Sequence, residues 1–196
     1  MATTKRPKPR LTPPDEDKLT QAQKELRDAI KSGPRGRFRM SGPFAIWMEA
    51  PQYGSLAQEL GGYVRYNTSV LPRLCEFAIL CTARHWRAHY EWMAHAPLAE
   101  AAGVKPEAIK AIQAGRRPST APADELAIYD FVKELYRDRR VGDPVYKRLH
   151  KVLGNRGMVE LVGILGYYAT VSMMLNVFRA ATDPAKPLPF KEPMAA

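Results

Sequence analysis

Hydrophobic positions recur three or four residues apart along most of the chain, in segments separated by proline, glycine and asparagine. This spacing marks one face of an α-helix, and no convincing run of alternating polar and apolar positions predicts a strand. The pattern therefore predicts an all-α domain of short helices that pack on one another. The predicted helices span 15–32, 44–50, 51–66, 105–115, 124–139, 143–154 and 157–180, and two further helices fall between 73 and 103.

The most informative stretch runs from Arg73 to Gly103 and is predicted to form two consecutive helices that divide near Arg87. The first is strongly apolar and carries one carboxylate, Glu76. The second carries Glu91 and His95, which share a helix face because they are four residues apart. A carboxyl group in apolar surroundings is suited to proton transfer near neutrality. An exposed stripe with ordinary helix ion pairs is the alternative interpretation of the same three residues.

Proline and charge divide the chain into four predicted parts. Residues 1–14 are rich in proline and basic residues and are predicted to be a disordered basic tail. Residues 15–40 form an N-terminal helix and a basic connector in which Arg35, Arg37 and Arg39 alternate with other residues. Residues 41–181 form the main helical domain, and the proline-rich 182–196 form a C-terminal tail.

The net charge of +10 is concentrated at the start of the chain, where residues 1–39 hold eleven basic and five acidic residues. A solvated basic tail accounts for this charge better than a nucleic-acid-binding arm, since no zinc-finger or RNA-binding motif accompanies it. The uncharged stretch 161–178 is long enough to cross a bilayer. Its glycines, tyrosines and hydroxyl side chains favour a buried helix, so we expect no membrane partner.

The two cysteines, Cys75 and Cys81, fall in the same predicted helix, six residues apart, and cannot pair with each other. We interpret them as buried core thiols, which fits a reducing, cytoplasmic location. His85 and His89 lie four residues apart, but the predicted break near Arg87 separates them and no metal-ligand motif is present. We therefore expect no metal and no other cofactor.

The chain between about 41 and 180 resembles the carboxymuconolactone decarboxylase family, also called AhpD-like. The resemblance rests on PRLCEFAILCTARHW, on YEWMAH followed by AEAAG, and on GYYATVSMMLNVFR. It implies an AhpD-like multi-helix bundle that forms homo-oligomers, as dimers, trimers or hexamers. The peroxidase branch of the family carries an upstream Glu and then CxxCxxxH. Counting back from His95 puts those cysteines at Ala88 and Glu91, so the resemblance argues against a thiol peroxidase.

The decarboxylase branch lacks the cysteine pair and can carry an acidic residue four positions before the histidine, as Glu91 does here. This resemblance implies Glu76, Glu91 and His95 as the acid–base set. The implied activity is that of a cofactor-independent lyase in aromatic compound catabolism, acting on a small carboxylated lactone or related ring-cleavage product. We expect Tyr90, Trp92 and Arg179 to contact this anionic substrate.

A non-catalytic oligomeric ligand-binding or stress-associated protein on the same fold is the alternative, because one fold supports many functions. A sheltered pocket that brings Glu76, Glu91 and His95 together would favour the enzyme. Exposure of all three to solvent would favour the binding protein.

Overall fold

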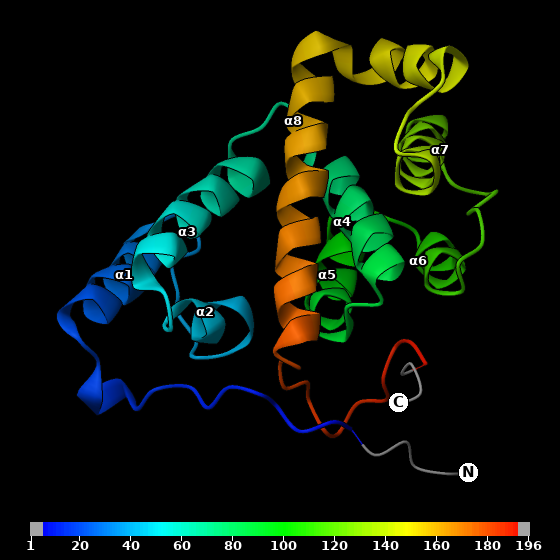
Figure 1. Ribbon diagram of the computed structural model, residues 1–196. Coiled ribbons are helices and arrows are strands. Elements are labelled where there is room, and N and C mark those ends of the chain that lie inside the picture. The colour runs from blue at the N-terminus through cyan, green and yellow to red at the C-terminus, as the bar shows by residue number, and fades with distance from the viewer. Residues whose placement is uncertain (1–5, 192–196) are drawn as a thin grey trace.

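The computed structural model describes residues 6–191, and every regular element in that range is a helix. Figure 1 shows a small N-terminal group of helices on one side of the long helix α8 and a larger group on the other. A 3₁₀ turn, Glu16–Lys18, comes before α1. The helices are α1 Gln21–Ser32, α2 Gly42–Trp47, α3 Pro51–Tyr66, α4 Pro72–Trp86, α5 His89–Ala101, α6 Pro106–Gln113, α7 Ala123–Asp138 and α8 Asp143–Val177.

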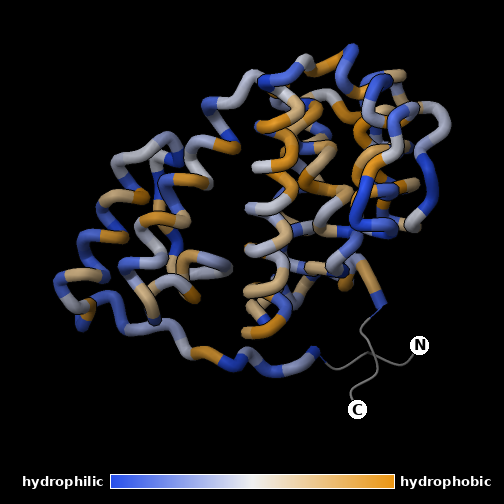
Figure 2. The backbone as a smooth tube through the Cα atoms, turned by 45° about the horizontal axis from the view of Figure 1, so that its top comes forward, coloured by the Kyte–Doolittle hydropathy of each residue, from blue (hydrophilic) through white to orange (hydrophobic). Residues whose placement is uncertain are grey.

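Helix α4 is the centre of the fold and contacts α3, α5, α6, α7 and α8. Its residues are buried on nearly every side, from Leu74 through Ala83. A helix that is apolar all round has to be enclosed by neighbours. Figure 2 shows this concentration of hydrophobic residues in α4 and in the adjoining part of α8. The larger hydrophobic core therefore lies between α4, α7 and α8.

A second, smaller core joins the N-terminal helices to the end of α8. Leu26 and Ile30 of α1 pack with Trp47 of α2 and with Val171 and Leu175 of α8. The chain between α1 and α2 carries Arg35, Arg37 and Arg39, so this packing fixes where the basic connector runs. The smaller core thereby holds the connector beside α8.

One predicted helix start differs from the structure, and one predicted break is confirmed. The first helix begins at Gln21 rather than near Asp15, because Thr20 forms a capping box with Gln23 and the acidic residues before it form the separate 3₁₀ turn. The break predicted at Gly154 is confirmed: Gly154 is non-helical (φ 62°, ψ −179°), and the helical segments on either side of it meet there in a kink within α8. Glycine reaches this conformation without the steric penalty of a Cβ.

The two ends of the described chain meet. Residues 6–14 contain no helix, and the Arg10 guanidinium donates to the Val177 carbonyl (2.8 Å) while the Arg10 backbone N–H donates to the Phe178 carbonyl (3.0 Å). Arg6 donates to the Thr182 hydroxyl (2.5 Å) and to the Asp183 carbonyl (2.8 Å). These bonds tie the segment after α8 to the start of the chain. The rest of the two predicted tails, 1–5 and 192–196, lies outside the described residues.

Among residues 6–191, α8 is the one helix long and apolar enough to cross a membrane, judged by length and composition alone. Half of its most apolar window is buried inside the structure. Leu161, Ile164 and Leu165 all belong to the larger core. Such burial is what the central helix of a folded domain shows.

Candidate functional site

Glu76, Glu91 and His95 come together at the contact between α4 and α5, and all three are buried. His95 donates from Nδ1 to Oε2 of Glu76 (2.6 Å) and from Nε2 to Oε1 of Glu91 (3.1 Å). The alternative of an exposed stripe on α4 is wrong for Glu76. Arg73, three residues before Glu76 on α4, forms ion pairs with Asp124 and Glu125 of α7 and none with Glu76.

The pairing explains the protonation of His95. Burial alone would lower its pKa, but the charge of Glu91 and the hydrogen bonds to Glu76 and Glu91 raise the pKa to about 9. The ring is therefore an imidazolium at neutral pH, and both of its N–H groups are used. A terminal nitrogen of Arg65, on α3, lies 3.6 Å from Oε1 of Glu76. The four side chains form a row of alternating charge: Arg65, Glu76, His95 and Glu91.

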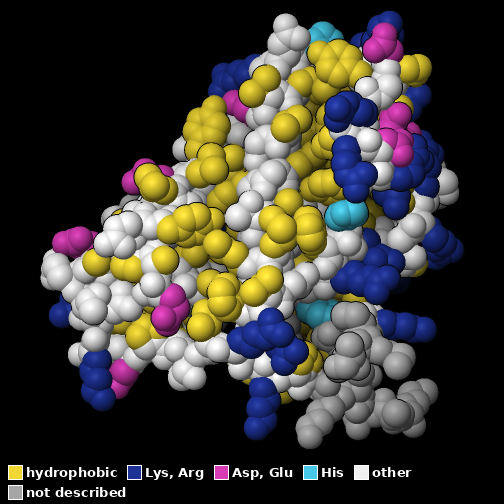
Figure 3. All heavy atoms as spheres, viewed as in Figure 1, with side chains coloured by type: hydrophobic (Ala, Val, Ile, Leu, Met, Phe, Trp, Pro, Cys, Tyr) yellow, Lys and Arg dark blue, Asp and Glu magenta, His cyan; other side chains and the backbone are white. Residues whose placement is uncertain are grey.

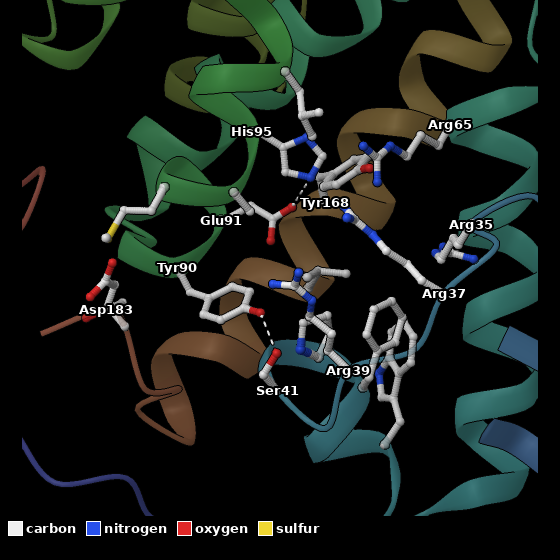
Figure 4. Close-up of a pocket in the computed structure, with 18 of the residues that line it drawn as sticks. Arg35, Arg37, Arg39, Ser41, Arg65, Tyr90, Glu91, His95, Tyr168 and Asp183 are labelled. Atoms are coloured by element: carbon white, nitrogen blue, oxygen red, sulfur yellow. Dashed lines mark hydrogen bonds and ion pairs between the residues drawn. The ribbon is translucent and has the colours of Figure 1, made fainter. Parts of the chain in front are cut away.

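The row ends at a cavity of about 430 Å³. Glu91 and His95 line this cavity, whereas Glu76 lies behind the imidazole and is not part of the wall. Figure 4 shows one Glu91 oxygen on His95 and the other directed away from the ring. Among the described residues no hydrogen bond engages that second oxygen. Glu91 is also in the first turn of α5, where the helix dipole favours a carboxylate.

Basic side chains make up much of the remaining wall. Arg35, Arg37 and Arg39 reach it from the connector, Arg65 from α3, and Lys186 from the segment after α8. Arg37 and Arg39 have no ion pair or hydrogen bond from their side chains within residues 6–191. Figure 4 shows Arg37 extending toward Tyr168 and the Glu91–His95 pair. The cavity thus offers free cations next to an acid–base group.

Two tyrosines from different helices supply hydroxyl groups. The Tyr168 ring lies edge-on to His95 with ring centres 5.1 Å apart, and burial raises its pKa well above the ordinary value, so it stays protonated. Tyr90 of α5 shares a hydrogen bond with the Ser41 hydroxyl (3.1 Å). Gly42 makes room for Tyr90, since a Cβ there would lie 2.3 Å from the ring. Both tyrosines line the cavity.

Of the six residues expected at the site, the structure brings four together. Tyr90, Glu91 and His95 line the cavity and Glu76 supports His95. Trp92 points elsewhere, into the core, where its ring meets Phe190 edge-on (5.2 Å). Arg179 follows α8 in an exposed left-handed turn and does not line the cavity.

The sequence pattern did not single out Arg65, Tyr168 or Lys186. Tyr168 follows Tyr167 in the uncharged stretch 161–178, and two adjacent tyrosines in such a stretch are a signal for a polar site. Arg65 and Lys186 carry no comparable signal, because only packing brings α3 and the C-terminal segment to the cavity.

The thiols lie away from this cavity. Cys75 and Cys81 are both free and buried in α4, and neither lines the cavity. Burial raises the pKa of Cys75 to about 12 and raises the pKa of Cys81 further. Residues 6–191 also contain no group of three or more His, Cys, Asp and Glu side chains placed to hold a metal ion.

Comparison with known proteins gives a fold but no closer relative. No family model matches the chain, and no curated protein matches it. Among solved structures it is similar to an alkylhydroperoxidase AhpD core, an uncharacterized peroxidase-related protein from Ralstonia eutropha JMP134, with a TM-score of 0.74 and 14% identity. The match covers 91% of this chain and 94% of that one. The chain therefore has the all-helical AhpD-core fold, as the sequence predicted.

Proposed function

We propose that this protein is a cofactor-independent carboxy-lyase that acts on a small anionic carbon acid, in the manner of carboxymuconolactone decarboxylases. The observation that carries the proposal is Glu91, a buried carboxylate that is hydrogen-bonded to an imidazolium on one oxygen and directed away from the ring with the other. A carboxylate held in this way can exchange a proton with a ligand while His95 supplies or takes up the charge.

The basic wall supports an anionic substrate. Arg37 and Arg39 have no partner of their own within the described residues, and a guanidinium binds a carboxylate through two parallel hydrogen bonds. A carboxylated lactone or related ring-cleavage product is small enough for a cavity of about 430 Å³. The substrate would lie between the connector and the Glu91–His95 pair.

The reaction follows from this placement. The bond between the substrate's carboxylate carbon and the ring carbon breaks, CO2 leaves, and the electron pair stays on the ring carbon as an enolate. The Tyr168 hydroxyl and the arginines stabilise the enolate oxygen. His95 passes its Nε2 proton to Glu91, and Glu91 delivers a proton to carbon. Proton uptake from solvent then restores the imidazolium.

The name of the structural neighbour raises a second activity, a thiol peroxidase. That chemistry needs two thiols within exchange distance and at least one accessible thiolate. Glu91 and Ala88 occupy the positions that the cysteines take in the peroxidase motif. The two thiols that the chain does have are buried and have raised pKa values, so this activity is disfavoured.

The exposed apolar surface supports a homo-oligomer. Leu56 and Leu60 of α3 and Val159 and Val162 of α8 are all at least half exposed. Figure 3 shows hydrophobic side chains gathered over these two helices. Apolar patches of this kind commonly mark subunit contacts. Light scattering of the purified protein would give the number of subunits.

The test of the lyase is carried out in D2O on a panel of carboxylated lactones and β-keto acids. We expect at least one to release CO2 and to gain one deuterium at the carbon that lost the carboxylate. Glu91→Gln should lower turnover by roughly 10²–10⁴, the usual contribution of a general acid or base. Glu76→Gln and His95→Ala should also lower turnover.

Glu100→Gln is the matched control, because Glu100 is an exposed carboxylate on the same helix, α5. It should leave turnover unchanged. Full activity in Glu91→Gln would remove this site from the chemistry. Binding of the anions with neither CO2 release nor deuterium uptake would instead support the non-catalytic ligand-binding protein.

A further inference from the structure

A second cavity, of about 340 Å³, lies on the α4–α6–α7 side of the molecule and shares no lining residue with the first. Figure 3 shows Lys and Arg side chains gathered on this side, at the right of the view. The cavity is formed where α4 and α7 both end, with the end of α6 beside them. Its wall consists of Cys81, Arg84, His85, Arg87, Ile112, Gly115, Tyr129, Val132, Lys133, Tyr136 and Arg137.

All the charged side chains in this wall are positive. Arg84, Arg87, Lys133 and Arg137 are basic, and no Asp or Glu belongs to the wall. Arg137 is paired with Asp138, which removes one positive charge. The carboxyl ends of α4, α6 and α7 together contribute roughly one and a half negative charges. An excess of positive charge remains, which suits an anionic ligand.

Arg84 is placed as a ligand-binding side chain. Its Nε atom is buried and has no hydrogen-bond partner in the described structure. Its guanidinium carbon lies 5.4 Å from the centre of the Phe190 ring, which holds the group from one side. Gly115 (φ 75°) gives it space, since a Cβ there would lie 2.8 Å from one of its terminal nitrogens. Because Nε is closed to solvent, a ligand in the cavity would meet the terminal nitrogens of Arg84, which have no hydrogen-bond partner within the described residues.

The other side of the wall is aromatic and apolar. His85 stacks on Tyr136 with ring centres 4.3 Å apart, and Tyr129, Val132 and Ile112 complete this surface. A cavity of this size holds more than an inorganic ion, and its apolar side suits an organic group. Arginine and lysine together suit a phosphate, because the guanidinium can bind it through two parallel hydrogen bonds and the ammonium adds a point charge.

We propose that this second cavity binds an organic phosphate monoester, with the phosphate on Arg84 and Lys133 and the organic group against Tyr129 and Tyr136. The site is separate from the acid–base cavity and does not depend on the function proposed for that cavity.

The probe is phenyl phosphate, which is titrated into the full chain at low salt and measured by calorimetry. Inorganic phosphate and phenol are titrated separately, because they represent the two parts of the probe. We expect one phenyl phosphate per chain and weaker binding of either half. Lys133→Gln should weaken binding roughly tenfold, as expected for the loss of one charge-assisted hydrogen bond. Lys151→Gln is the matched control, because Lys151 is an exposed lysine of α8 that lines neither cavity.

The imidazole of His85 reports on the site directly. Burial and the charge of Lys133 lower its pKa. A bound dianion should raise the pKa again, and proton NMR of the ring would detect the change. The proposal is overturned if neither heat nor a His85 shift appears, or if Lys151→Gln weakens binding as much as Lys133→Gln. It is also overturned if Arg39→Gln, in the first cavity, abolishes the binding.

Discussion

Two buried carboxylate networks in this protein are built in contrasting ways. Glu160 of α8 accepts hydrogen bonds from the Tyr63 hydroxyl (3.0 Å), the Ser69 backbone N–H (2.6 Å), the Ser69 hydroxyl (2.5 Å) and the Arg156 side chain (3.0 Å). Both oxygens are fully used, and the bonds tie the loop between α3 and α4 to α8. Glu160 lines neither cavity.

The network at His95 has fewer hydrogen bonds, and it borders a cavity. Glu91 has one hydrogen bond, to the His95 ring, and its other oxygen is directed away from that ring. The two networks show that a buried carboxylate alone does not indicate chemistry. The informative feature is an incomplete set of hydrogen bonds at a cavity, because a fully bonded carboxylate has nothing left to offer a ligand.

The largest effect on stability is expected from His95→Ala. It leaves Glu76 and Glu91 buried without the cation between them, and breaking such a pair costs on the order of 3–5 kcal/mol. Urea unfolding would measure the loss. Adding Glu76→Gln to His95→Ala should restore part of it by removing one uncompensated charge. A loss below about 1 kcal/mol would mean that the imidazolium does not hold this network together.

A smaller loss is expected from Glu160→Gln, on the order of 1–3 kcal/mol, because the amide cannot accept all four hydrogen bonds. Turnover and ligand binding should stay unchanged, in contrast to Glu91→Gln. The same urea unfolding and activity assays would compare the two variants. Loss of turnover at unchanged stability in Glu160→Gln would contradict the structural role assigned to it.

The two networks should also respond to opposite ends of the pH range. The pKa of His95 is raised from 6.5 to about 9, so its contribution to stability is complete below pH 6.5 and is lost as the pH rises toward 9. Over that interval the free energy of unfolding should fall by up to about 1.4 kcal/mol per pH unit. The hydrogen bonds from Ser69, Arg156 and Tyr63 lower the pKa of Glu160 from 4.5 to about 2.

The contribution of Glu160 is therefore present above pH 4.5 and is lost as the pH falls toward 2. Urea unfolding across the pH range would measure both the loss of stability at acid pH and the loss at alkaline pH. Glu160→Gln should reduce the loss of stability at acid pH, to which Asp124 also contributes because its pKa is lowered too, and should leave the loss at alkaline pH unchanged. If stability still falls at alkaline pH in His95→Ala, another group causes that fall.

The smallest effect is expected from Tyr63→Phe. It removes one of the hydrogen bonds to Glu160 and leaves those from Ser69 and Arg156, so the loss should be about 0.5–1.5 kcal/mol. Chemical denaturation against the wild type would measure it. A loss as large as that of Glu160→Gln would mean that the bonds act as a single unit rather than separately.

Much of the fold could be predicted from the sequence, because the causes are local. Helical spacing gave the helices, and proline and glycine marked most of their ends. The first helix was misplaced at its start because the Thr20–Gln23 capping box competes with the acidic turn before it. Glu91 and His95 share a face by spacing alone, so their contact was also predictable.

The sequence by itself therefore determined the helices, the all-α class and the Glu91–His95 pair. Only the tertiary structure decided that Glu76 lies behind His95, that Arg65 and Tyr168 join the site, and that Trp92 belongs to the core instead. The physical reason is that helical spacing fixes which residues share a face. Which faces meet depends on how α3, α4, α5 and α8 bury their apolar surface together.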